Sequence, residues 1–205
     1  MIPKSITLAS ANSNKALEFG SLLTGIRVEP MPESFNLPEE TGSSFYENAR
    51  LKALAVRDQY ISHASVLDGH IPWVMADDSG IEVAALAGAP GIFSARYAGE
   101  NATDVDNVNK LLAELGESTN RQARFVCEIV AVSPGGEELR SAGILEGLIA
   151  REPHGEFGFG YDPIFIPEGY ELTVSELSAD EKNRISHRAR ASFGLLEQLR
   201  GGKSS

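Results

Sequence analysis

The chain has 205 residues, 42% of them hydrophobic and 23% charged, and a formal net charge of −11 at pH 7, which argues against nucleic-acid polymers as partners because these need extended basic surfaces. The single cysteine, Cys127, excludes an internal disulfide, and the longest apolar run, Phe125 to Val132, is too short to cross a bilayer. We therefore expect a cytoplasmic protein that binds neither a membrane nor a nucleic-acid polymer.

The chain opens with a strand, a polar turn and a helix. Ser5 to Ala9 alternates small polar and apolar residues and predicts a strand. Ser10 to Asn14 is a polar turn, and Lys15 to Leu23 places its apolar side chains on one helical face. This order is typical of an α/β unit. Pro and Glu are frequent from Pro30 to Gly42, where we expect a loop.

Two helices are predicted in the middle of the chain. Ser44, with Glu47 three residues later, matches a capping box and predicts a helix that begins there and extends to Tyr60. Thr103 is placed to cap a second helix, whose apolar stripe runs to Leu115.

The second half of the chain combines strands with a final helix. Arg124 to Val132 and Glu138 to Ile149 predict two strands joined by the turn Ser133 to Gly136. A capping box at Ser178 begins the last helix, on which Phe193 is expected to be buried. No repeat or linker interrupts the pattern, so all 205 residues are expected to form one α/β domain.

Two adjacent carboxylates, Asp77 and Asp78, follow a short apolar strand predicted over Trp73 to Ala76. They would lie where the chain leaves the sheet, which is where ligands of open α/β sheets collect. Neighbouring strand residues point to opposite faces, so only one of the two acids is expected to face a given cleft. Carboxylates are ligands that Mg²⁺ prefers. An Asx-turn with both acids in solvent is the alternative.

The turn from Ser10 to Lys15 is a candidate anion site. Small polar residues before a helix direct backbone N–H groups and hydroxyls toward its N-terminus, and Lys15 adds a positive charge. The segment is not a Walker loop, because the glycines and the Gly-Lys-Ser/Thr ending are missing. An ordinary N-cap with an exposed lysine is the alternative.

Glycines alternate with aromatic residues from Phe157 to Pro163. Glycine lets the backbone approach a flat ligand while an aromatic ring lies against it, and Asp162 is placed to accept hydrogen bonds from a base or ribose. A bend packed with core aromatics would have the same sequence.

A short basic segment in the predicted last helix contrasts with the acidic chain. Helical spacing would place Lys182 with Ser186, and Arg184 with Arg188, on shared faces. Cations near the start of a helix oppose its macrodipole, which favours a ligand-binding role, although a solvated charged face is the alternative. The basic and imidazole side chains of this segment are Lys182, Arg184, His187, Arg188 and Arg190.

These motifs, in this order, are similar to those of the inosine/xanthosine triphosphate pyrophosphatase family, a group of house-cleaning nucleotide hydrolases. The resemblance extends from Leu8 to Leu199. The segments that carry it are Leu8–Lys15, Glu39–Gly42 with Phe45 and Glu47–Ala49, Ala76–Gly80, Gly88–Tyr97, Gly158–Pro163 and Ser186–Arg188.

The resemblance implies a fold and an assembly. The fold is an elongated mixed β-sheet with flanking helices, which form two lobes around a nucleotide cleft. The usual assembly is a homodimer. The implied reaction is the Mg²⁺-dependent hydrolysis of ITP, dITP or XTP to the monophosphate and pyrophosphate.

The resemblance also implies a metal and phosphate group. Glu40 and Asp78 would hold Mg²⁺, with Asp77 as a possible further ligand. Asp78 would also accept the proton of the attacking water, and Lys15 would stabilise the pyrophosphate leaving group. The residues implied to bind the triphosphate are Ser10, Asn12 and Lys15.

A second implied group binds the nucleoside. Ser79 would contact substrate, Lys182 would reach phosphate or base, and His187 with Arg188 would face the keto edge of the purine. A 6-amino purine would leave a buried donor unpaired there, at a cost of about 1–3 kcal/mol. The residues implied to line the pocket are Phe159, Gly160, Tyr161 and Asp162.

The sequence departs from the commoner family pattern in three places. Ser10-Ala11 replaces Thr-Gly, Phe157 stands where a glycine is often found, and the stretch from Ala53 to Ala76 is longer. The aromatic side chain of Phe157 is expected to narrow the mouth of the base pocket.

Two other functions fit parts of the sequence. One is a pyrophosphatase for modified pyrimidine or methylated nucleotides, against which the segments Gly158–Asp162 and Ser186–Arg188 argue. The other is a non-catalytic nucleotide sensor, against which the retention of both Glu40 and Asp78 argues.

Overall fold

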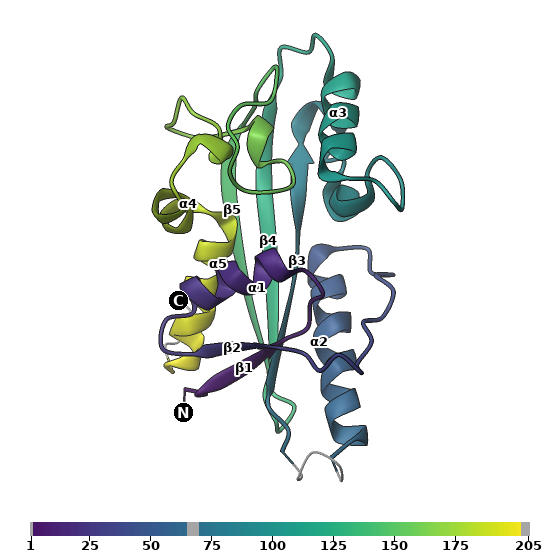
Figure 1. Ribbon diagram of the computed structural model, residues 1–205, viewed down its shortest axis with the longest axis vertical. Coiled ribbons are helices and arrows are strands. Elements are labelled where there is room, and N and C mark those ends of the chain that lie inside the picture. The colour runs from purple at the N-terminus through teal and green to yellow at the C-terminus, as the bar shows by residue number, and fades with distance from the viewer. Residues whose placement is uncertain (1, 65–69, 202–205) are drawn as a thin grey trace. The chain divides into compact units, whose positions relative to one another are not determined.

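A computed structural model describes residues 2–64 and 70–201 (Figure 1). Within these residues a six-stranded sheet has the order β2-β1-β3-β4-β5-β6. The strands are β1 Ser5–Leu8, β2 Arg27–Pro30, β3 Trp73–Val83, β4 Gln122–Val132, β5 Glu138–Ile149 and β6 Phe165–Pro167. The α-helices are α1 Ser13–Leu22, α2 Phe45–Ser62, α3 Asp104–Leu115, α4 Ala179–Ile185 and α5 His187–Leu199.

The sheet is mixed, as the sequence predicts. β1 pairs in parallel with both β2 and β3, with Leu8 opposite Pro30 on one side and Met75 on the other. β5 and β6 are antiparallel. The predicted α/β class, with helices flanking a mixed sheet, is therefore confirmed. No helix within the described residues combines the length and apolarity needed to cross a membrane.

The chain divides into two compact units. The first comprises the described parts of residues 1–78, 127–143 and 188–205, and the second comprises residues 79–126 and 144–187. The chain passes from one unit to the other within β3, β4 and β5, and again between His187 and Arg188.

In the first unit the sheet carries helices on both faces (Figure 1). Met75 of β3 packs with Phe19 of α1 and Leu195 of α5. Its neighbours Val74 and Ala76 instead pack with the apolar face of α2. Because successive side chains of β3 alternate between the two faces of the sheet, each following residue of the strand faces either α1 and α5 or α2. In the second unit α3 covers the sheet.

Strand β3 is longer than predicted. It does not end at Ala76 but continues through the acidic pair to Val83, so neither the predicted strand end nor the alternative Asx-turn is present. Gly80, which follows Ser79 in this strand, is required by packing, because a Cβ there would collide with the Ser94 side chain. The Ser94 hydroxyl also accepts a hydrogen bond from the Ile81 N–H at 2.9 Å.

The single last helix predicted from Ser178 is also wrong. The Ser178 capping box is present, but α4 ends at Ile185. The backbone of the C-cap residue Ser186 is extended at φ −61° and ψ 154°, and α5 begins at the next residue. Arg184 and Arg188 therefore lie on different helices. The break also shifts the buried face, so Phe193 is 60% exposed while Leu195 is buried.

Two smaller differences concern the first unit. Strand β2 falls in a segment for which the sequence predicted no strand. At the start of α2, Ser44 caps the helix by accepting from the Glu47 N–H. The Glu47 carboxylate, however, accepts from the N–H of Ser43 at 2.6 Å, so the predicted capping box is only half formed.

Two buried serines in the first unit generate a stability prediction. The Ser141 hydroxyl donates to the Ala191 carbonyl at 2.7 Å, whereas the Ser192 hydroxyl has no hydrogen-bond partner within residues 2–64 and 70–201. Ser141→Ala should lower the free energy of unfolding by about 1 kcal/mol, and Ser192→Ala should leave it unchanged or raise it by up to about 1 kcal/mol. Urea denaturation measures both, and equal losses in the two variants would contradict this assignment.

Candidate functional site

The acidic pair of β3 lies in the interior of the first unit. Asp77 is 1% exposed and Asp78 is 7% exposed. The expectation that the two carboxylates face opposite sides of the sheet is confirmed by their partners. Asp77 meets residues of α1 and α5, whereas Asp78 meets residues of α2.

Two cations surround Asp77. The Lys15 Nζ lies 2.8 Å from its Oδ2, and the Arg188 Nε lies 3.9 Å from the same oxygen. Arg188 is fixed by a second carboxylate, since its Nη1 donates to Glu18 at 3.0 Å. Burial opposes ionisation of Asp77, but the positive charges of Lys15, Arg188 and Lys52 outweigh it and lower the pKa of Asp77 to about 2 from 3.8.

The turn before α1 presents Lys15. Asn12 is the N-cap of α1 and accepts hydrogen bonds from the N–H groups of Asn14 and Lys15 at 2.9 and 3.2 Å. The Ser10 hydroxyl accepts from the Asn12 N–H at 3.1 Å. The capped turn matches the alternative interpretation, but Lys15 is not exposed as that alternative required, because only 14% of its side chain is accessible.

The other face of β3 holds Asp78, Lys52 and Glu40. The Asn48 side-chain N–H donates to Asp78 at 3.1 Å, and Asn48 is itself fixed by accepting from the Gly42 N–H at 2.8 Å. The Lys52 Nζ lies 2.6 Å from Glu40 and 3.6 Å from Asp78. One buried ammonium group therefore joins the two carboxylates that the sequence assigned to Mg²⁺.

Sequence reasoning missed Asn48 and Lys52 as site residues. A signal was present, because the apolar positions of α2 include Ala49 and Ala53, and Asn48 and Lys52 are one helical turn apart on the same buried side. A lysine at a buried helical position is rare unless it is paired. That rule would have identified Lys52.

The pKa values on this face shift upward. Burial raises the pKa of Asp78, and the nearby charge of Glu40 raises it further, against the opposing effect of Lys52. Burial would lower the pKa of Lys52, but the charges of Asp78, Asp77 and Glu40 raise it overall. Neighbouring carboxylates with pKa values displaced in opposite directions are characteristic of a division between a charge-stabilising acid and a proton-accepting one.

The carboxylates on this face of β3 offer Mg²⁺ a small set of oxygen ligands. Glu40 and Asp78 supply carboxylate oxygens close to a common point, namely the Lys52 ammonium. Across the described ranges, no group of three or more His, Cys, Asp and Glu side chains is placed to hold a metal ion. Mg²⁺ commonly takes one or two carboxylates and completes its shell with water and substrate phosphates. Two carboxylates fit that pattern.

A second cluster lies in the second unit. The Asp162 carboxylate accepts hydrogen bonds from the Phe159 N–H at 3.0 Å and from the Lys182 Nζ at 2.8 Å. The same Nζ lies 4.8 Å from the centroid of the Phe159 ring. These hydrogen bonds join Asp162 to the loop that contains Phe159 and hold the Lys182 ammonium group over the Phe159 ring.

Three other predicted residues of the second unit differ in exposure. Tyr161 belongs to the core, where its hydroxyl donates to the Ser94 carbonyl at 2.8 Å. The His187 ring is buried and stacks on Phe125 with centroids 4.8 Å apart. Ser79 is half-buried in β3. The alternative of a bend packed with core aromatics thus holds for Tyr161, whereas Phe157 in the same stretch is exposed.

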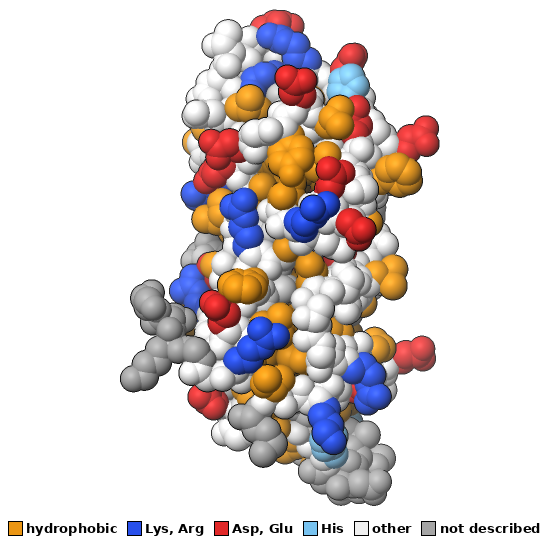
Figure 2. All heavy atoms as spheres, turned by 90° about the vertical axis from the view of Figure 1, so that its left-hand side faces the viewer, with side chains coloured by type: hydrophobic (Ala, Val, Ile, Leu, Met, Phe, Trp, Pro, Cys, Tyr) orange, Lys and Arg blue, Asp and Glu red, His pale blue; other side chains and the backbone are white. Residues whose placement is uncertain are grey.

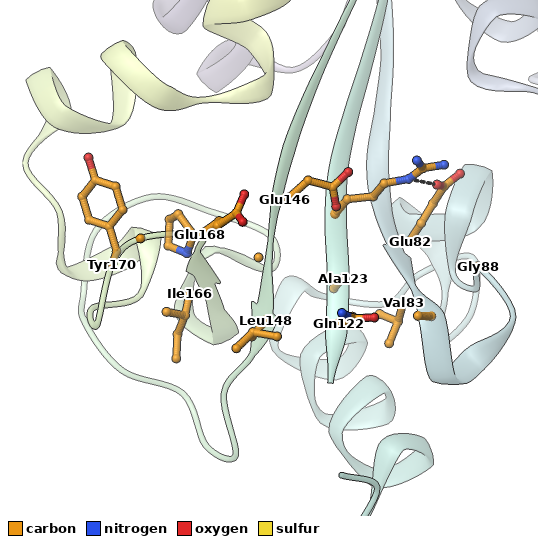
Figure 3. Close-up of a pocket in the computed structure, with 15 residues that line it drawn as sticks. Glu82, Val83, Gly88, Gln122, Ala123, Glu146, Leu148, Ile166, Glu168 and Tyr170 are labelled. Carbon is orange, nitrogen blue, oxygen red and sulfur yellow. Dashed lines mark hydrogen bonds and ion pairs between the residues drawn. The ribbon is translucent and has the colours of Figure 1, made fainter. Parts of the chain in front are cut away.

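The second unit also contains a hollow of about 720 Å³, shown in Figure 3. Leu148 and Ile166 are among its apolar walls, and Glu82 pairs with Arg124 at 2.7 Å along one side. None of the predicted site residues lines it. Its carboxylates outnumber its one arginine, which makes it a poor site for a triphosphate.

The basic residues form no single surface on the face drawn in Figure 2. Lysine and arginine side chains there are interspersed with acidic and hydrophobic ones. Largely buried cations lie instead beside Asp77 and Asp78, namely Lys15, Arg188 and Lys52.

Comparison with known proteins identifies the family of this chain. Residues 6–198 match the model of the Ham1 family. The chain belongs to the Ham1 family. It is 45% identical to the dITP/XTP pyrophosphatase of Methylacidiphilum infernorum, covering 93% of this chain and 92% of that protein. It is also 45% identical to the dITP/XTP pyrophosphatase of Bacillus subtilis, covering 97% and 98%.

A solved structure extends the likeness to the fold. The HAM1 protein from Coxiella burnetii matches this Ham1-family chain with a TM-score of 0.84 at 42% identity, covering 98% of this chain and 100% of that one. The family membership that the sequence motifs predicted is thereby confirmed.

The cations around Asp77 predict that removing its negative charge will strongly lower the stability of the protein. Asp77→Asn should lower the free energy of unfolding at pH 7 by about 2–3 kcal/mol, because it removes a carboxylate whose pKa is lowered to about 2 and which lies 2.8 Å from the Lys15 Nζ. The contribution of a carboxylate with a lowered pKa is present above its unfolded pKa and is lost as the pH falls through its folded pKa. The difference from the wild type should therefore shrink between pH 5 and 2.

Urea denaturation across that pH range measures this difference. Asp58→Asn is the matched control, since Asp58 is 70% exposed and lies 3.8 Å from Arg57 in a surface ion pair. The control should change the stability by less than about 0.5 kcal/mol. Equal losses in the two variants would contradict the role given to the buried pair.

Proposed function

We propose that this chain hydrolyses the non-standard purine nucleoside triphosphates ITP, dITP and XTP to nucleoside monophosphate and pyrophosphate. The observation that carries the proposal is the pair of adjacent buried carboxylates in β3, which face opposite sides of the strand and have a cation on each side. Relatives named dITP/XTP pyrophosphatase at 45% identity support the choice of substrate.

The Asp77 side of the strand receives the polyphosphate. Lys15 supplies the positive charge, and Asp77 orients its ammonium group from 2.8 Å. Ser10 and Asn12 contribute polar groups of the turn before α1, where helix N-termini bind anions. As charge develops on the pyrophosphate leaving group, Lys15 stabilises it. Arg188 adds a second cation beside Asp77.

The Asp78 side carries the proton transfer. Asp78 accepts the proton of the water that attacks the α-phosphorus. Asn48 fixes the direction of this carboxylate. Glu40 and Asp78 would hold Mg²⁺, which when bound neutralises phosphate charge and orients the phosphates. Asp77 lies on the opposite face of β3, paired with Lys15, and is not assigned to the metal.

The nucleoside is assigned to the residues that the family resemblance implies for it. Lys182, held by Asp162 over the ring of Phe159, is available to phosphate or base. His187, with Arg188, contacts the keto edge of a purine. The other residues in this assignment are Ser79, Gly160 and Tyr161. A 6-keto purine satisfies donors that a 6-amino purine leaves unpaired, which disfavours ATP.

We further propose that the whole chain acts as one enzymatic domain, as a homodimer in the cytoplasm. The match of residues 6–198 to one family model supports the single domain. The family resemblance implies the homodimer, and the single cysteine supports the cytoplasm. Sedimentation equilibrium tests the dimer directly.

The proton-acceptor role predicts the effect of one substitution. Asp78→Asn should lower kcat for dITP by about 10²- to 10⁴-fold, because the amide cannot take the proton of the attacking water, while dITP binding persists. Pyrophosphate release with Mg²⁺ measures kcat, and calorimetry measures binding. Asp58→Asn serves again as the surface control. Near-normal turnover of the Asp78→Asn protein would overturn the assignment.

The substrate panel separates the two other functions. Pyrophosphate release should be fastest with ITP, dITP and XTP and slower with GTP and ATP. A preference for modified pyrimidine or methylated nucleotides would favour the first alternative, and binding without release would favour the sensor.

A further inference from the structure

Phe157 is exposed to an unusual degree for an aromatic residue. Its relative exposure is 71%, against 60% for Phe193 and 53% for Phe93. Each of these phenyl rings is left largely in water, at a cost that grows with the exposed apolar area. What distinguishes Phe157 is that it lies in a loop rather than on a helical element.

The backbone around Phe157 is held in place. Its own N–H donates to the Ser175 carbonyl at 3.2 Å. Two residues later the Phe159 N–H donates to Asp162, and the Gly160 N–H donates to Asp104 at 2.7 Å. Protein acceptors thus satisfy the N–H groups of Phe157, Phe159 and Gly160, which holds this part of the loop in place.

Glycines on either side restrict the loop further. Gly155 and Gly158 have φ values of +82° and +83°, where a side chain is strained. A Cβ at Gly155 would collide with the Ser175 backbone, and one at Gly158 would collide with Asp162. The segment is therefore packed tightly against its supports, while the ring of Phe157 is presented to solvent.

The neighbouring residues have the chemistry of a nucleoside contact. Phe159 follows two positions later, with the Lys182 ammonium over its ring and Asp162 beside it. Aromatic side chains stack on bases regardless of the groups at the base edge, since every base has a π-face. A ring on a fixed backbone loses little entropy when it does so.

We infer that Phe157 stacks on the purine ring of the bound nucleotide and so determines affinity for the base. This inference rests on the proposed function and adds a substrate contact to it. Stacking uses the face of the base and not its edge, so Phe157 strengthens the binding of inosine, xanthosine and adenine nucleotides alike. Discrimination between keto and amino purines stays with the polar groups.

Kinetics of dITP hydrolysis test the contact. Phe157→Ala should raise KM about tenfold and leave kcat within about twofold, as expected for a contact made equally in ground and transition states. Phe157→Tyr should retain the wild-type KM, whereas Phe157→Leu, which is apolar but has no π-face, should resemble the alanine variant. Phe193→Ala, which removes another largely exposed phenyl ring, on α5, is the matched control and should change neither constant.

A fluorescence measurement gives a readout that is independent of turnover. The chain has one tryptophan, Trp73, so the double variant Trp73→Phe/Phe157→Trp reports from position 157 alone. Addition of inosine 5′-monophosphate without metal should quench its emission with a saturable dependence on concentration. Trp73→Phe/Phe193→Trp should show no such quenching.

The outcomes separate this inference from the proposed function. If the wild type releases pyrophosphate from dITP but Phe157→Ala has an unchanged KM, the inference is wrong and the proposed function stands. An unquenched fluorophore at position 157, in a protein that binds the monophosphate by calorimetry, overturns it equally. A wild type that releases no pyrophosphate from any of these substrates refutes the proposed function itself.

Discussion

Two adjacent carboxylates buried within a β-strand impose the constraint on which the first unit is built. Neighbouring strand residues face opposite sides of a sheet, so one cation cannot form a direct ion pair with both Asp77 and Asp78. An unpaired buried charge would be prohibitively costly. Each face therefore brings its own cation, Lys15 from α1 on one side and Lys52 from α2 on the other. The positions of both helices follow from this requirement as well as from apolar packing.

The same constraint separates the chemistry of the two acids. Asp77 is surrounded by cations that outweigh its burial, so it remains a fixed negative charge that orients Lys15. Asp78 shares a single ammonium with Glu40, and burial raises the pKa of its carboxyl group. In the proposed reaction one carboxylate positions the phosphate-binding lysine and the other accepts a proton. The division arises from the strand geometry and needs no difference in residue type.

Local patterns predicted much of this arrangement, and tertiary contacts decided the rest. The hairpin joining β4 and β5 and the cap of α1 at Asn12 follow from short-range rules, and the alternation that splits the acidic pair follows from strand period alone. The continuation of β3 through Gly80 does not follow from short-range rules, because only packing against Ser94, which is distant in sequence, distinguishes this segment from a turn. The break between α4 and α5 at Ser186 could not be predicted from the sequence either, since no glycine or proline marks it. Lys52 was missed because pattern analysis treats lysine as a surface residue.

The most direct test of the account is where oxygen from water enters the products. Hydrolysis of dITP in H₂¹⁸O by the Mg²⁺-loaded wild-type protein, followed by mass spectrometry of both products, identifies the phosphorus that is attacked. Attack on the α-phosphorus, assisted by Asp78 with pyrophosphate leaving beside Lys15, places the label in dIMP and leaves the pyrophosphate unlabelled. Label in the pyrophosphate, or release of orthophosphate in its place, would contradict the proposed roles of both residues.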